Sequence, residues 1–229
     1  MKHYVTAKIQ QDFVDAVEQA YRTNAMLYGR TQASRSVCRG RGRCCSGILE
    51  DLFALLIHDY VIKDPVRWVV LVDCPVKLVP DDEKRNRYPD FAIYKRLSDD
   101  LLELVYMADL KTNTGYFRGK ALEVLEKKRD EVEAFLSARE ASVSIKGKRF
   151  SVQFAAALKS DLIIYSNANA NAVELEEQQR SAVRAQDQTS LMYILGDWAE
   201  GDRQIPRHED FNALEERIVL QLKGKGWEK

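Results

Sequence analysis

The chain has 229 residues, of which 45% are hydrophobic and 31% charged, and 35 basic residues balance 35 acidic ones. This composition excludes a disordered chain, and a net charge of zero argues against a protein that coats nucleic acid over its whole surface. No apolar run approaches a length of about 18 residues, which a membrane-spanning helix needs, so we expect a cytoplasmic protein with no membrane partner.

The chain begins with a predicted amphipathic helix over residues 8–28, in which Ile9, Phe13 and Val17 recur at helical spacing. A basic segment overlaps its end, because no acidic residue occurs between Gln19 and Leu49. Guanidinium groups make bidentate contacts with phosphate and guanine, which favours nucleic-acid binding. A solvated basic loop is the alternative interpretation. The candidate DNA contacts in this segment are Arg35, Arg39, Arg41 and Arg43.

The chain has four cysteines. Cys38, Cys44 and Cys45 lie in the basic segment, and Cys74 follows it. Their spacing lacks the paired Cys-x2-Cys pattern of zinc modules, so reduced structural thiols are the expected role.

The segment "GILEDLFALLIHDYVI", residues 47–62, predicts a second helix that is apolar on nearly every side and therefore deeply buried. Within it, Glu50 shares a helical line with Phe53, Ala54 and Ile57. A carboxylate on an inward face needs a partner, such as a metal ion or a water bound to one. The alternative is that Glu50 complements the helix dipole in the first turn.

The next predicted elements are strands. Residues 66–79 are rich in β-branched side chains and predict one strand bent at Pro75, followed by a polar loop over 81–87. Strands over 91–96 and 101–112 flank the turn "LSDD" and should form an antiparallel hairpin.

The rest of the chain alternates between the two kinds of element. We expect helices at 119–140, 173–185 and 211–222, and strands at 150–158, 162–166 and 191–198. This order predicts a single α/β domain over residues 1–229 with a central mixed sheet flanked by helices.

The hairpin carries the candidate catalytic residues. Side chains alternate along a strand, so Asp109 and Lys111 should share one face, and the turn should bring Asp90 beside Asp109. Carboxylates at this range repel one another, and Mg²⁺ bound through them would relieve the repulsion. The lysine could then act on a phosphate oxygen or an attacking water. The alternative is a surface hairpin whose charges pair with each other.

Asp90, which follows Pro89, and the Asp109-Leu110-Lys111 triplet resemble the motif of the PD-(D/E)xK, or restriction-endonuclease-like, nucleases. The order of elements over about residues 47–166 is also similar to that family's core, with residues 1–46 and 167–229 as additions. The resemblance implies that Asp90 and Asp109 bind Mg²⁺, with Mn²⁺ able to substitute, that Lys111 positions or activates water, and that Glu50 completes the acidic shell.

The stretch after the triplet, "ADLKTNTGYFRGK", is most similar to type II restriction endonucleases. This resemblance implies cleavage of double-stranded DNA. A homodimer is expected from reaction geometry, because one such site cuts one strand and a palindromic target mirrors a two-fold axis. A site-specific nuclease would need a companion methyltransferase to spare its host. Two alternatives remain: a repair or phage-defence nuclease with little sequence preference, and a non-catalytic nucleic-acid-binding module.

The polar side chains after the triplet could contact phosphates or bases beside the cut, since short polar side chains there reach the DNA backbone. A loop with an ordinary helix cap is the alternative. The candidate DNA contacts in this stretch are Thr112, Asn113, Tyr116 and Arg118.

Overall fold

The computed structural model describes residues 3–28, 46–79, 85–113, 130–138, 140–166, 189–199 and 203–223, except 63, 65, 131 and 194. Its helices are α1 (Ala7–Tyr28), α2 (Ser46–Leu56), the π-helical turn η1 (Ile57–Val61) that continues α2, and α5 (His208–Lys223). Its strands are β1 (Trp68–Val72), β2 (Val76–Val79), β3 (Arg85–Arg87), β4 (Phe91–Arg96), β5 (Leu101–Asn113), β6 (Glu140–Ile145), β7 (Lys148–Ser166), β8 (Thr189–Tyr193), β9 (Leu195–Ala199) and β10 (Arg203–Pro206).

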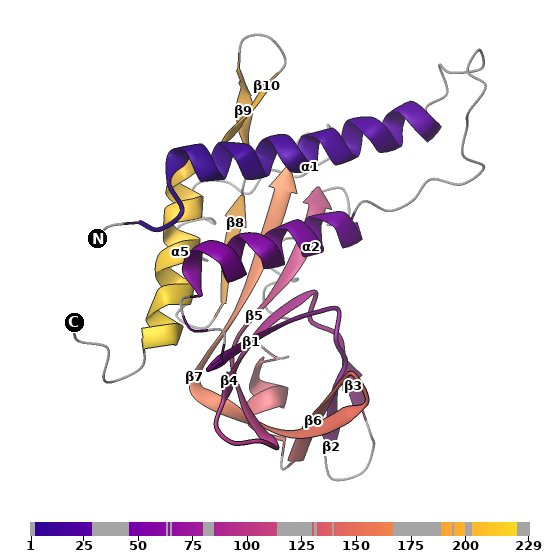
Figure 1. The fold of residues 1–229 in the computed structure, drawn as a ribbon, viewed down its shortest axis with the longest axis vertical. Helices are drawn as coiled ribbons and strands as arrows, with labels where there is room; N and C mark the ends of the chain where they lie inside the picture. The colour runs from indigo at the N-terminus through magenta and orange to yellow at the C-terminus, as the bar shows by residue number, and fades with distance from the viewer. Residues whose placement is uncertain are drawn as a thin grey trace.

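Among the described residues, eight strands form one mixed sheet in the order β1-β4-β5-β7-β6-β2-β3, with β8 paired to β7. The β5–β7 and β7–β8 pairs are parallel and the others antiparallel. Figure 1 shows α1, α2 and α5 gathered at one end of the sheet, while β2, β3 and β6 curl round at the other end. Strands β9 and β10 form a separate hairpin.

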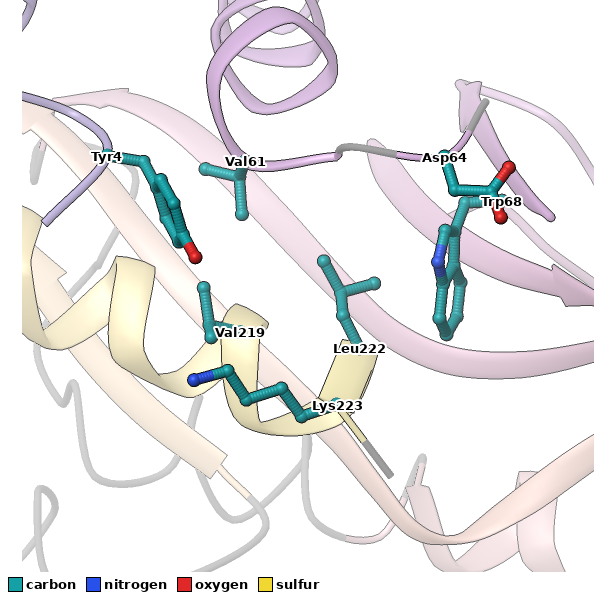
Figure 2. Close-up of a pocket in the computed structure, with 7 residues that line it drawn as sticks. All are labelled: Tyr4, Val61, Asp64, Trp68, Val219, Leu222 and Lys223. Atoms are coloured by element: carbon teal, nitrogen blue, oxygen red, sulfur yellow. The ribbon is translucent and has the colours of Figure 1, made fainter. Parts of the chain in front are cut away.

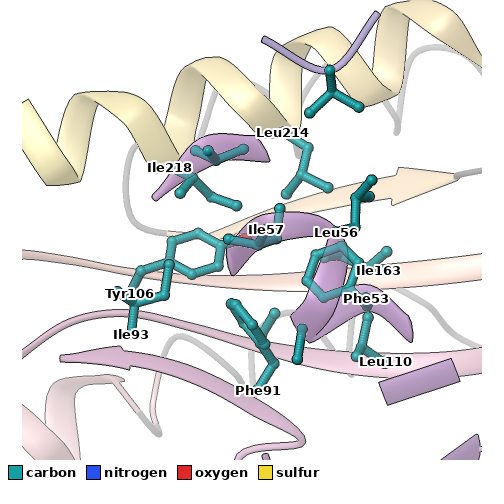
Figure 3. Close-up of a cluster of buried hydrophobic side chains, with 14 of the residues drawn as sticks. Phe53, Leu56, Ile57, Phe91, Ile93, Tyr106, Leu110, Ile163, Leu214 and Ile218 are labelled. Carbon is teal, nitrogen blue, oxygen red and sulfur yellow. The ribbon is translucent and has the colours of Figure 1, made fainter. Parts of the chain in front are cut away.

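The core has two parts, one for each end of the sheet. The first lies between the helices and strands β1, β4, β5 and β7, and its aromatic centre includes Phe53, whose ring meets that of Phe91 edge-on at 5.0 Å. Figure 3 shows these side chains converging from α2, α5 and the sheet. The second part fills the curled end, where Val132 and Phe135 from a short helical segment pack inside the strands. The helices therefore cover one end of the sheet, and the strands enclose the second part of the core at the other end.

A buried ion pair joins α5 to the sheet. Arg217 donates to both carboxylate oxygens of Asp161, at 2.9 Å and 2.7 Å, and the Tyr106 hydroxyl donates to Asp161 Oδ2 at 2.9 Å. Asp161 is fully buried, and this burial raises its pKa although Arg217 opposes the shift. Three charge-assisted donors thus satisfy a carboxylate that water cannot reach.

Several sequence predictions are confirmed. Helix α1, the hairpin of β4 and β5, and helix α5 lie within a few residues of their predicted positions. Phe53, Ala54 and Ile57 form the buried face of α2, as their helical line predicts. No helix among the described residues is long and apolar enough to cross a membrane.

Other predictions are wrong in instructive ways. The predicted strand over 66–79 is two strands, β1 and β2, because the chain turns at Asp73, where φ is 44°. In the strand order β1 is the first strand, whereas β2 is next to the last. The predicted strands at 150–158 and 162–166 are one strand, β7, and the predicted strand at 191–198 is two, β8 and β9. Part of the predicted loop over 81–87 is strand β3.

The remaining differences concern helices and missed strands. Helix α2 is not buried on all sides as predicted, because Ile48 and Leu55 are exposed on its outer face. The helix predicted at 119–140 ends earlier, since residue 140 already begins β6, and both β6 and β10 were absent from the prediction. The helix predicted at 173–185 lies outside the described residues.

Candidate active site

The β4–β5 hairpin brings the two predicted carboxylates together. The antiparallel register pairs Phe91 with Ala108, so the residues one step outward, Asp90 and Asp109, lie opposite each other. Leu110, between Asp109 and Lys111, is buried in the core on the other face of the sheet. The alternation predicted from the sequence is therefore confirmed, and the three polar side chains share one face.

Contacts between these side chains fix Asp90. Its Oδ2 atom accepts hydrogen bonds from the backbone N–H of Leu110 at 2.8 Å and from Lys111 Nζ at 3.0 Å. Lys111 Nζ also lies 4.0 Å from Asp109 Oδ2. All three side chains are partly exposed, so a ligand in solvent can reach them.

Glu50 is the third predicted acid, and its electrostatic environment places it at this site. Its pKa is raised from 4.5 to about 7, first because burial disfavours the charged form and then because Asp90 and Asp73 repel it. Lys111 opposes the shift. A carboxyl group half-titrated near neutral pH, beside two other acids, is typical of a functional site and unusual for a simple helix cap.

Asp73 is a residue that the sequence interpretation missed. It lies directly after β1, and its N–H donates to the carbonyl oxygen of Asp90 at 3.1 Å. The segment "VDCP" carried the signal, since Asp adopts left-handed backbone more readily than most residues and a proline follows two positions later. The sequence prediction instead places a bend at Pro75 within one strand over residues 66–79.

The donor set fits a hard cation such as Mg²⁺, because carboxylate oxygens are its preferred protein ligands and one or two of them suffice. Asp90 and Asp109 supply such a pair. Among the described residues, no group of three His, Cys, Asp or Glu side chains is arranged to hold a metal ion. Glu50 is the third acid near this pair, since its pKa responds to Asp90 and Lys111.

The predicted DNA contacts cannot be placed in the same way. Arg35, Arg39, Arg41, Arg43, Tyr116 and Arg118 lie outside the described residues. Thr112 and Asn113 continue β5 beyond Lys111 in their backbone, and their side chains are outside the described part. Cys38, Cys44 and Cys45 are also outside it, whereas Cys74 is a free thiol.

A small cleft elsewhere in the molecule has a different character. Figure 2 shows it between the N-terminal segment, the end of η1, Trp68 and α5, where Val219 and Leu222 line it. Its carboxylate, Asp64, accepts hydrogen bonds from the N–H groups of Val66 and Arg67 at 3.1 Å and so serves the turn before β1.

Comparisons with known proteins support the fold. No family model and no curated protein matches the sequence. The solved structure of P. aeruginosa ATCC27853 NucC in its cAAA-bound form is similar, with a TM-score of 0.50 and 10% identity over 98% of this chain and 93% of that one. E. coli MS115-1 NucC in its cAAA-bound form has a TM-score of 0.49 at 10% identity, covering 99% of this chain and 93% of that one. The α/β class, with a central mixed sheet flanked by helices, is thus confirmed.

Proposed function

We propose that the chain is a Mg²⁺-dependent endonuclease that hydrolyses phosphodiester bonds of double-stranded DNA. The observation that carries the proposal is the convergence of Asp90, Asp109 and Lys111 at the open end of one hairpin, with the raised pKa of Glu50 beside them. A structural hairpin would need its charges to pair, but it would not need a third acid whose pKa is raised by burial and then by Asp90 and Asp73.

Each residue has a separate role in this proposal. Asp90 and Asp109 would hold Mg²⁺, or Mn²⁺ in its place. When bound, the ion would polarise a phosphoryl oxygen and lower the pKa of a water molecule. Lys111 would orient that water or stabilise charge on the phosphate, and Glu50 would accept a hydrogen bond from water at the rim of the site.

Two specificity classes fit the proposal. The fold shared with the solved NucC structure supports the phage-defence alternative with little sequence preference. A type II restriction endonuclease is the second candidate, supported by the polar segment that follows the catalytic triplet. The arginines of the basic segment would contact phosphates in either case. A homodimer would cut both strands, because one such site cuts one strand.

Digestion of a mapped supercoiled plasmid tests the proposal. We expect the parent protein to nick and linearise the plasmid with Mg²⁺ and to leave it intact with a chelator. Lys111→Ala should slow cleavage by about 100-fold or more, whereas Lys95→Ala should not slow it. Lys95 is a matched control because it lies on the same hairpin and faces Glu103 at 4.0 Å, away from the acidic site.

The products distinguish the candidates. A smear of fragments supports the defence nuclease, and discrete bands at fixed positions support the restriction enzyme. An intact plasmid that nevertheless shifts on a gel in the presence of the protein would identify a non-catalytic binding module and contradict the proposal.

A further inference from the structure

Asp73 has a backbone conformation that few side chains adopt. Its φ is 44°, in the left-handed region, and Lys146 is the other non-glycine residue of the described part with positive φ. Asp and Asn tolerate this region better than most residues, and glycine has no penalty there. A β-branched residue at such a position is strongly disfavoured.

This conformation lets Asp73 extend the pairing of β1 and β4 beyond the regular strands. The last paired residues are Val72 and Phe91, and the next hydrogen bond runs from Asp73 N–H to the Asp90 carbonyl at 3.1 Å. The residue before Asp90 is Pro89, which has no N–H to donate. The start of β4 is therefore held toward β1 by the Asp73 bond.

Asp90 is consequently fixed from two neighbouring strands. Asp73 holds its backbone from the β1 side, while Leu110 N–H and Lys111 Nζ hold its carboxylate from the β5 side. Loss of the first bond would free the backbone from which the carboxylate projects. The carboxylate could then lose its alignment with Asp109 without any change in the side chains of the site.

We propose that Asp73 is a positioning residue of the active site, because its left-handed backbone lets the chain leave β1 while its N–H still faces and holds the Asp90 carbonyl. The inference rests on the proposed nuclease function. It assigns the effect to backbone conformation, so the negative charge of Asp73 is not required.

A series of substitutions separates conformation from charge. Asp73→Gly and Asp73→Asn both remove the charge and keep the left-handed conformation accessible, whereas Asp73→Val opposes it. Lys146→Val is the matched control, because it strains a left-handed residue in the β6–β7 turn, and neither of those strands pairs with β1 or β4. Melting temperatures report the strain in each variant.

We expect Asp73→Val to reduce the single-turnover nicking rate by about 10- to 100-fold, the scale of misplacing a group in an active site. It should also need more Mg²⁺ for half-maximal rate. Lys146→Val should lower the melting temperature without changing the rate or the Mg²⁺ dependence. At a pH well above 7, where Glu50 is ionised whether or not residue 73 is charged, Asp73→Gly and Asp73→Asn should cut like the parent, which is the rescue that a positioning role through the backbone requires.

Two results would overturn the inference. One is cleavage by Asp73→Val at the parent rate, and the other is equally slow cleavage by all three variants, which would assign the effect to the charge. A parent protein that cuts no DNA would contradict the proposed function instead. Amide hydrogen exchange then decides the inference, since the Asp73 N–H must be protected in the parent and the Mg²⁺ affinity must fall in Asp73→Val alone.

Discussion

Asp90, Asp109 and Lys111 act on different parts of the proposed reaction, so their substitutions should have different consequences. Asp109→Asn should weaken both Mg²⁺ binding and cleavage, because the neutral amide is a poorer ligand. Lys111→Ala should leave Mg²⁺ binding intact, or strengthen it by releasing Asp90 Oδ2 from the ammonium group, while cleavage falls by about 100-fold. Calorimetric titration with Mg²⁺ and plasmid nicking measure the two effects separately.

Folding should survive both of these changes. The side chains are partly exposed at a strand end, and removal of the Asp109 charge lessens its repulsion of Asp90. Thermal melts provide the control. If Lys111→Ala cut as fast as the parent, the hairpin charges would be structural.

Glu50 should make both cleavage and stability depend on pH. Its pKa is raised from 4.5 to about 7, so in this range the folded state binds a proton that the unfolded state has released. The stability that protonated Glu50 contributes is therefore complete below pH 4.5 and is lost as the pH rises through 7. Glu50→Gln keeps the shape without the titration. Its melting temperature relative to the parent should accordingly increase between pH 5 and pH 8.

Cleavage should respond to pH in the opposite direction. The ionised form of Glu50 favours a nearby cation, so the nicking rate at limiting Mg²⁺ should rise as the pH passes 7. The Glu50→Gln profile should lack that rise. Parallel profiles for the two proteins would show that another group controls the reaction.

Helix α5 is attached to the sheet by the contact between Arg217 and Asp161. Arg217→Met would leave a buried carboxylate without its cation, which should lower the free energy of unfolding by about 3 kcal/mol or more. The double variant Arg217→Met, Asp161→Asn should recover part of this loss, because the amide oxygen can still accept the Tyr106 hydrogen bond. Chemical denaturation of both variants measures the difference. Equal stability of the single and double variants would show that the charge is not the cause.

The proposed DNA binding and the proposed homodimer concern the whole molecule. The basic segment should contribute phosphate contacts, so Arg39, Arg41 and Arg43 changed together to Ala should weaken binding and flatten the slope of log affinity against log salt. Binding measured between low and high salt tests this. An unchanged slope would mean that these arginines face solvent.

The predicted homodimer can be tested independently of activity. Sedimentation of the protein with and without DNA measures the mass of the assembly. A strictly monomeric protein that nicks one strand at a time would contradict the dimer while leaving the nuclease proposal in place.

The sequence predicts the hairpin and the approach of its charged residues. Period-two alternation puts Asp109 and Lys111 on one face, and the four-residue turn brings Asp90 near them. The exact register also depends on an irregularity of the ladder between Ile93 and Tyr94, since Arg96 pairs with Leu102 near the turn whereas Phe91 pairs with Ala108.

The helical line that Glu50 shares with Phe53, Ala54 and Ile57 likewise predicts that Glu50 lies on an inward face, and those three apolar residues are buried. These inferences depend on neighbours along the chain or across one turn.

Which strands become neighbours depends on long-range pairing, which a local sequence pattern does not contain. The β-branched run over 66–79 looks continuous in sequence, yet β1 and β2 pair with different partners on either side of the left-handed turn at Asp73. Long-range pairing also makes β7 one strand, since its two halves join β6 and β8. Asp73 therefore joins the site through a backbone bond to Asp90, and no local pattern can predict a bond that depends on how distant strands pair.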